Sequence, residues 1–194
     1  AWRGLSIGVL KDSVFAYTKK VILALQSQGT LPDMVQVGNE INHGIIWPDG
    51  SVNNFNGLAS LFQSGVDAVL EVAPQTIIML HVALGGQNEE TVAFIDEMLK
   101  RGVTFDVIGE SYYPQWHGTL DDLKNNLHDL VRRYNKDVIV VEYTFRKEEV
   151  NDITFGLPNG KGKGTFIWEP LNTWEYFFEP DGKANQLLKL YDTI

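Results

Sequence analysis

The chain has 194 residues, which is the size of one domain, and its 44% hydrophobic content is ordinary for a protein with a packed core. This composition excludes a disordered, collagen-like or coiled-coil chain, and the absence of cysteine removes disulfides and thiolate sites. The formal net charge of −9 argues against nucleic acid as a partner, and no apolar run approaches the roughly 20 residues that span a membrane.

Short apolar runs alternate with longer amphipathic stretches, a pattern typical of βα units around a parallel sheet. In chain order, the expected strands are 34–38, 76–81, 106–112, 138–143 and 165–168. The expected helices are 14–28, 55–72, 91–101, 120–134 and 185–191. Residues 144–164 have no convincing helical period, so we expect a short helix there or none. Because no linker interrupts this order, we expect residues 1–194 to form a single domain.

Two glutamates stand at the ends of otherwise apolar expected strands. Glu40 follows the first strand and Glu142 lies near the end of the fourth. A carboxylate in such a place is costly to bury unless something uses it, and a carboxylate pair is the basic equipment of glycoside hydrolysis. Two structural carboxylates bonded to helix amides or arginines are the alternative at this point.

Aromatic and polar side chains also gather just beyond the strand ends, where rings can stack on sugar faces. His81 either bonds a substrate hydroxyl, orients a glutamate or is a satisfied buried imidazole. Ser111 lies in no serine-hydrolase motif. No compact metal-binding spacing and no phosphate-binding glycine loop occurs, so we expect neither a metal nor another cofactor.

Five segments resemble, in order, those of glycoside hydrolase family 53, the endo-β-1,4-galactanases that cut arabinogalactan. They are PDMVQVGNEINHGIIWPDG at 32–50, IMLHVALGG at 78–86, FDVIGESYYPQWHGTLDDLKNNL at 105–127, KDVIVVEYTF at 136–145 and PNGKGKGTFIWEP at 158–170. The resemblance implies a retaining glycosidase of the (β/α)8 TIM-barrel fold that acts on a neutral polysaccharide, β-1,4-galactan. It also implies a secreted protein, although no leader is visible in this chain.

The resemblance implies that Glu40 is the general acid/base and Glu142 the nucleophile. Asn39 would contact the sugar 2-hydroxyl, and a tyrosine that belongs after the sixth barrel strand would be Tyr112 or Tyr113. The candidate substrate-binding residues are Asn39, His81, Ser111, Tyr112, Tyr113, Trp116 and Trp168.

The expected strands correspond to strands 4 to 8 of such a barrel, so we expect an α/β fold, an incomplete (β/α)8 barrel of about five parallel strands with flanking helices. Three strands are unaccounted for, because a full barrel takes about 250 residues. The two outermost strands would expose unpaired backbone, which predicts a homo-oligomer that covers them. A catalytically inactive carbohydrate-binding remnant and a half-barrel that requires a partner chain are the alternatives to an active hydrolase.

Overall fold

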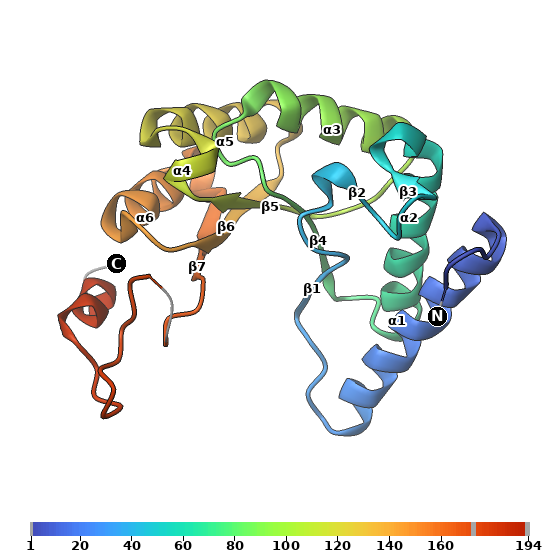
Figure 1. The fold of residues 1–194 in the computed structure, drawn as a ribbon, viewed down its shortest axis with the longest axis horizontal. Coiled ribbons are helices and arrows are strands. Elements are labelled where there is room, and N and C mark those ends of the chain that lie inside the picture. Colours follow the sequence, from blue (N-terminus) through green and yellow to red (C-terminus); the bar gives the residue numbers. More distant parts are fainter. Residues whose placement is uncertain (1, 172–173, 193–194) are drawn as a thin grey trace. The chain divides into compact units, whose positions relative to one another are not determined.

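The computed structural model describes residues 2–171 and 174–192, which divide into two compact units. The first unit contains residues up to 81 together with 92–107, and the second contains 82–91 and the residues from 108 onward. Figure 1 follows the chain from α1 to the carboxyl-terminal segment, and each unit is described by itself below.

Two long helices form the main layer of the first unit. Helix α1 (Ile7–Ser27) is capped by Ser6, whose hydroxyl accepts the backbone N–H of Val9. The helix starts about two turns before the expected residue 14. Helix α2 (Phe55–Val72) packs against α1 and buries most of its apolar side chains. Each fully buried Leu or Phe contributes about 1.5–3 kcal/mol, so this face of α2 is a main source of stability in the unit.

Strand β1 (Met34–Gln36) pairs in parallel with β4 (Ile77–Val82) in the first unit, with Met34 opposite Ile77. Between β1 and α2 the chain forms the short turn η1 (Ile41–His43), the hairpin of β2 (Gly44–Ile45) and β3 (Gly50–Ser51), and the turn η2 (Val52–Asn54). This hairpin was not expected, because two-residue strands leave no periodic signal. Helix α3 (Asn88–Lys100) follows β4.

The second unit contains the strands β5 (Val107–Tyr112), β6 (Asp137–Tyr143) and β7 (Gly162–Ile167). Strands β6 and β7 are parallel, with two register shifts between them. Helix α4 (Pro114–His117) is a single turn, and α5 (Leu120–Tyr134) begins at a capping box in which Thr119 and Asp122 bond each other's backbone N–H groups. The turns η3 (Pro158–Gly160) and η4 (Gln186–Asp192) are short 3-10 segments.

Strand β7 and the expected closing helix differ from expectation. Strand β7 begins at Gly162 rather than at residue 165, and the expected closing helix is the 3-10 segment η4. Helix α6 (Lys147–Phe155) is a short helix, which agrees with the short helix or none expected for residues 144–164, although no helical period marks its position. Its buried face carries Lys147, Asn151 and Thr154 besides Val150, and hydrogen bonds satisfy these polar groups. An apolar pattern cannot reveal a helix whose buried face is largely polar.

Among the described residues, no helix is both long and apolar enough to cross a membrane.

Candidate active site

Glu40 follows β1 through a tight turn. Gly38 has a φ of 77°, and a Cβ at this position would lie 2.7 Å from Ile41 Cγ2. Glu40 itself is half-buried and has a left-handed φ of 46°, a conformation that is uncommon for a residue with a side chain. Such strain gathers at functional sites, so the backbone at Glu40 points to a role for its carboxylate.

The side chain of Asn39, next to Glu40, is oriented by a residue of β1. Gln36 Nε2 donates to Asn39 Oδ1 at 3.1 Å and to the carbonyl oxygen of Gly38 at 2.9 Å. Asn39 is exposed beside Glu40. The amide of Asn39 is therefore held in one orientation at the surface, as a residue that recognises a hydroxyl group requires.

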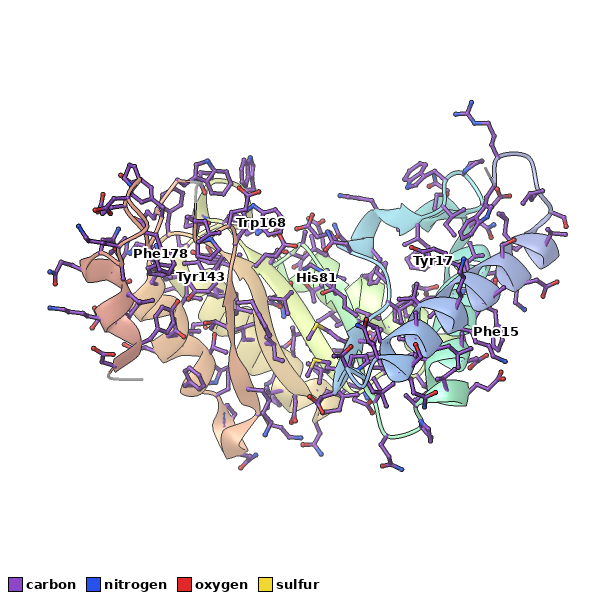
Figure 2. The ribbon with its side chains drawn as sticks, turned by 90° about the horizontal axis from the view of Figure 1, so that it is seen from below. Phe15, Tyr17, His81, Tyr143, Trp168 and Phe178 are labelled. Atoms are coloured by element: carbon purple, nitrogen blue, oxygen red, sulfur yellow. The ribbon has the colours of Figure 1, made fainter. Side chains whose placement is uncertain are left out.

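His81 supports the Glu40 backbone from inside the first unit. It lies in β4 (Figure 2) and is fully buried, and its Nδ1 accepts the backbone N–H of Glu40 at 3.4 Å. Burial lowers the pKa of His81 to about 4, so the imidazole is neutral at neutral pH. Because Nδ1 is the acceptor, the single ring proton is on Nε2.

Glu142 lies near the end of β6 in the second unit and is half-buried. The phenol of Tyr113 donates to Glu142 Oε2 at 3.2 Å. The backbone N–H of Tyr113 in turn donates to His117 Nδ1 at 3.1 Å, so the last residue of α4 holds this tyrosine. The carboxylate of Glu142 therefore has a fixed orientation, set by a ring that is itself buried.

The structure separates the two candidate tyrosines. Tyr112 is fully buried, and its hydroxyl donates to the carbonyl oxygen of Gly118 at 3.0 Å, whereas Tyr113 reaches Glu142. Ser111 is fully buried in β5, and its carbonyl oxygen accepts the N–H of Gly85 at 3.1 Å. Tyr112 and Ser111 thus have clear structural contacts, and contact with a substrate remains a prediction for both.

Trp168 and Trp116 are exposed, with 42% and 62% of their surface accessible to solvent. Trp168 follows β7, where its backbone N–H donates to the carbonyl oxygen of Tyr143, and Trp116 lies in α4. A groove of about 920 Å³ runs beside α4. It is lined by Tyr112, Pro114, Gln115, Gly118, Thr119, Leu120, Asp121, Phe145 and Arg146. Exposed aromatic rings are suited to stacking on the flat face of a sugar.

The model of the family described as Glycosyl hydrolase family 53 matches residues 1–192. The chain belongs to glycosyl hydrolase family 53. Among its relatives, an uncharacterized protein in the bgaB 5' region of Niallia circulans is 44% identical over 75% of this chain and 42% of its own length. A probable arabinogalactan endo-β-1,4-galactanase A of Neosartorya fischeri is 32% identical over 87% of this chain and 57% of its own length.

A family 53 catalytic domain from Ignisphaera aggregans superposes with a TM-score of 0.92 at 30% identity. The superposition covers 98% of this chain and 66% of that domain. This match and the five parallel strands with their helices confirm the expected incomplete (β/α)8 barrel. The chain spans about half the length of the curated relatives described above.

Sequence reasoning did not single out Trp174 or Phe145 of this family 53 chain. Trp174 joins Tyr113, Trp116 and Phe145 in a group of rings that we call the aromatic cluster. Trp174 lies six residues after Trp168 and does not directly follow a strand, so its position in the sequence did not mark it as a candidate site residue.

A buried acid was missed as well. Glu110 lies in β5 and is fully buried. Its Oε2 accepts the N–H of Leu84 and its Oε1 accepts Asn126 Nδ2, both at 3.3 Å. Burial raises the pKa of Glu110 to about 8, against the smaller opposite effect of these hydrogen bonds. An acidic residue within an otherwise apolar strand is the feature of the sequence that could have identified Glu110.

Proposed function

We propose that this family 53 chain is an endo-acting glycoside hydrolase that cleaves β-1,4-galactan with retention of configuration. The observation that carries the proposal is the family match over residues 1–192, together with a glutamate in the turn that follows β1 and another in β6. Each glutamate has a supporting partner within its own unit, His81 for Glu40 and Tyr113 for Glu142.

In the proposed mechanism, a carboxylate oxygen of Glu142 attacks the anomeric carbon while Glu40 donates a proton to the departing glycosidic oxygen. The covalent glycosyl-enzyme then reacts with water, from which Glu40 removes a proton, and Glu142 leaves as a carboxylate. Two inversions give net retention. This chemistry needs the two carboxyl groups about 5 to 5.5 Å apart when substrate is bound.

Two features support a neutral polysaccharide as the substrate. The net charge of −9 disfavours an anionic polymer, and the exposed rings of Trp116 and Trp168 offer apolar faces for sugars. The relative from Neosartorya fischeri is named as an arabinogalactan endo-β-1,4-galactanase, which favours galactan over other β-glycans. We also propose that residues 1–194 act as one barrel domain and that the protein is secreted to reach such a polymer.

The first experiment measures reducing-end release from β-1,4-galactan, with NMR to identify the anomer formed first. We expect the β-anomer first, and a fall of roughly 100-fold or more in rate for Glu40→Gln and for Glu142→Gln. The matched control is Glu148→Gln, which changes an exposed glutamate on α6 and should leave the rate unchanged. Equal rates in all four proteins would refute the assigned roles.

An activated aryl β-galactoside separates the two roles. Its leaving group needs no proton, so Glu40→Gln should still form the glycosyl-enzyme, whereas Glu142→Gln should not. Added azide should then release a β-galactosyl azide from Glu40→Gln, because azide attacks without a general base. The opposite pattern would exchange the two assignments.

A second candidate is a carbohydrate-binding remnant or a half-barrel that needs a partner chain. It is favoured by the chain spanning about half the length of those relatives, and by β1 and β7 each pairing with a single strand among the described residues. Binding of galacto-oligosaccharide without turnover would support the remnant. Turnover restored by an amino-terminal barrel fragment would support the half-barrel, and a compact monomer in light scattering would exclude a homo-oligomer that covers the edges.

A further inference from the structure

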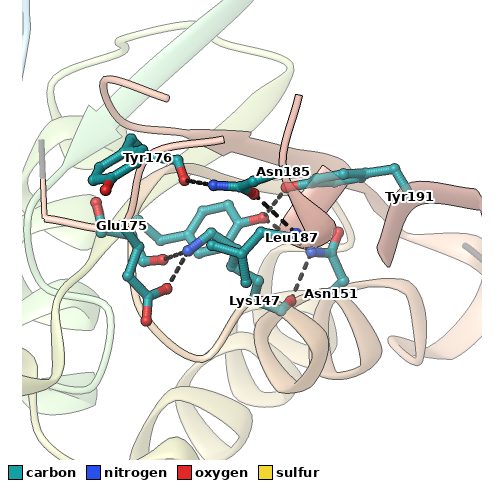
Figure 3. A network of polar contacts seen from close by, with 9 residues as sticks. Lys147, Asn151, Glu175, Tyr176, Asn185, Leu187 and Tyr191 are labelled. Carbon is teal, nitrogen blue, oxygen red and sulfur yellow. Dashed lines mark hydrogen bonds and ion pairs between the residues drawn. The ribbon is translucent and has the colours of Figure 1, made fainter. Parts of the chain in front are cut away.

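The carboxyl-terminal segment, residues 174–192, is attached to β6 and α6 at two points (Figure 3). At the first, the amine of Lys147 is buried and pairs with the carboxylate of Glu175. The same amine donates to the carbonyl oxygen of Thr144 at 2.7 Å and lies 5.4 Å from the ring centre of Phe177. A buried amine with these partners fixes the segment at Glu175.

The second attachment lies at the far end of the segment. The hydroxyls of Tyr191 and Tyr143 are 2.9 Å apart and share a hydrogen bond. Asn151 Nδ2 donates to the Tyr143 hydroxyl at 2.9 Å, and Thr165 Oγ1 lies 3.2 Å from it. Tyr143 directly follows Glu142 in β6, so the network is built on the strand that carries the proposed nucleophile.

Trp174 directly precedes the first attachment and contacts the aromatic cluster. Its ring centre lies 5.5 Å from that of Tyr113, nearly perpendicular, and 6.0 Å from that of Phe145, nearly parallel. Trp174 has a left-handed φ of 46°, and the next residue, Glu175, pairs with Lys147. Tyr113 is the residue whose phenol donates to Glu142.

We propose that Trp174 is a positioning residue that holds the Tyr113 ring so that its phenol donates to Glu142, and that the pair of Lys147 and Glu175 keeps Trp174 in place. The inference rests on the proposed function for the role of Glu142 as nucleophile. Trp174 covers one side of a tyrosine ring that is only 6% exposed, so its removal opens that side to water and lets the ring rotate. The effect reaches Glu142 through Tyr113.

The decisive experiment is a double-mutant cycle between Trp174→Ala and Tyr113→Phe, read by the carboxyl carbon NMR signal of Glu142 in protein labelled at glutamate. The signal is assigned by its loss in Glu142→Gln. We expect Trp174→Ala to move this signal in the same direction as Tyr113→Phe, and to move it no further in the double variant. A Glu142 signal unchanged by Trp174→Ala would overturn the proposal, and so would additive shifts. This readout does not require turnover.

Kinetics give a second readout. We expect Trp174→Ala to lower kcat by about 2- to 10-fold, the range of one aromatic contact, with a smaller change in KM. Trp174→Phe should restore most of the loss because a ring remains, and Glu175→Gln should show part of it. The matched control Tyr176→Ala removes an exposed ring two residues further along and should behave as wild type. An unchanged kcat in an active Trp174→Ala protein would refute the inference alone, whereas activity retained in Glu142→Gln would refute the proposed function.

Discussion

Glu110 gives a prediction of how stability depends on pH. The carboxyl group is fully buried, and its pKa is about 8 in the folded protein against an ordinary value of 4.5. Between these values the folded state holds a proton that the unfolded state releases. Unfolding is therefore favoured increasingly as the pH rises from about 4.5 to about 8, and the stability lost over that range is complete above pH 8.

The size of this effect follows from the pKa difference. Each pH unit within this range lowers the free energy of unfolding by about 1.4 kcal/mol, so the whole pKa shift of Glu110 corresponds to a loss of about 5 kcal/mol. A domain of this size is stable by only about 5–15 kcal/mol, so one ionised carboxyl here removes a large part of the total. Glu110→Gln removes the titration and keeps an oxygen that can accept from Leu84 or Asn126.

Urea unfolding at pH 5, 6, 7 and 8, followed by tryptophan fluorescence and circular dichroism, measures the difference between wild type and Glu110→Gln. We expect the variant to gain about 4 kcal/mol on wild type between pH 5 and pH 8, and to be the more stable protein at pH 8. The control Glu90→Gln, an exposed glutamate on α3, should run parallel to wild type. A constant difference between Glu110→Gln and wild type across this range would refute the reasoning.

Three further predictions concern stability and are measured by urea unfolding at constant pH. Gly86→Ala should lower the free energy of unfolding by several kcal/mol, because a Cβ at Gly86 would lie 1.8 Å from the carbonyl oxygen of His117. An alanine variant as stable as wild type would contradict this close approach. Thr119→Ala should lower the free energy of unfolding by about 1 kcal/mol, because α5 loses its N-terminal cap. Thr119→Ser keeps a capping hydroxyl and should be nearly as stable as wild type. Leu61→Ala should cost about 2–5 kcal/mol at a fully buried site, against almost nothing for Leu171→Ala at a largely exposed one.

The sequence alone was sufficient to predict the five parallel strands, most of the helices and the family. Apolar runs mark buried strands, and the helices α2, α3 and α5 carry apolar residues at helical spacing because one face of each is buried. It also pointed to Glu40 and Glu142 as candidate catalytic residues, since a carboxylate that ends an apolar strand stands out against its surroundings.

The tertiary structure decided what depends on contacts between distant residues. Tyr112 and Tyr113 are adjacent and alike in sequence, yet neighbouring residues at a strand end point in different directions, and Tyr113 alone of the two is bonded to Glu142 among the described contacts. The bounds of helix α6 could not be predicted because hydrogen bonds, rather than apolar packing, satisfy much of its buried face. Trp174 and Glu110 could be recognised only from contacts with residues more than fifteen positions away along the chain. Trp174 contacts Tyr113, and Glu110 accepts hydrogen bonds from Leu84 and Asn126. Local sequence determines which residues are apolar, capped or charged, whereas the folded chain determines which of them meet, and a hydrogen bond or a shifted pKa exists only where they meet.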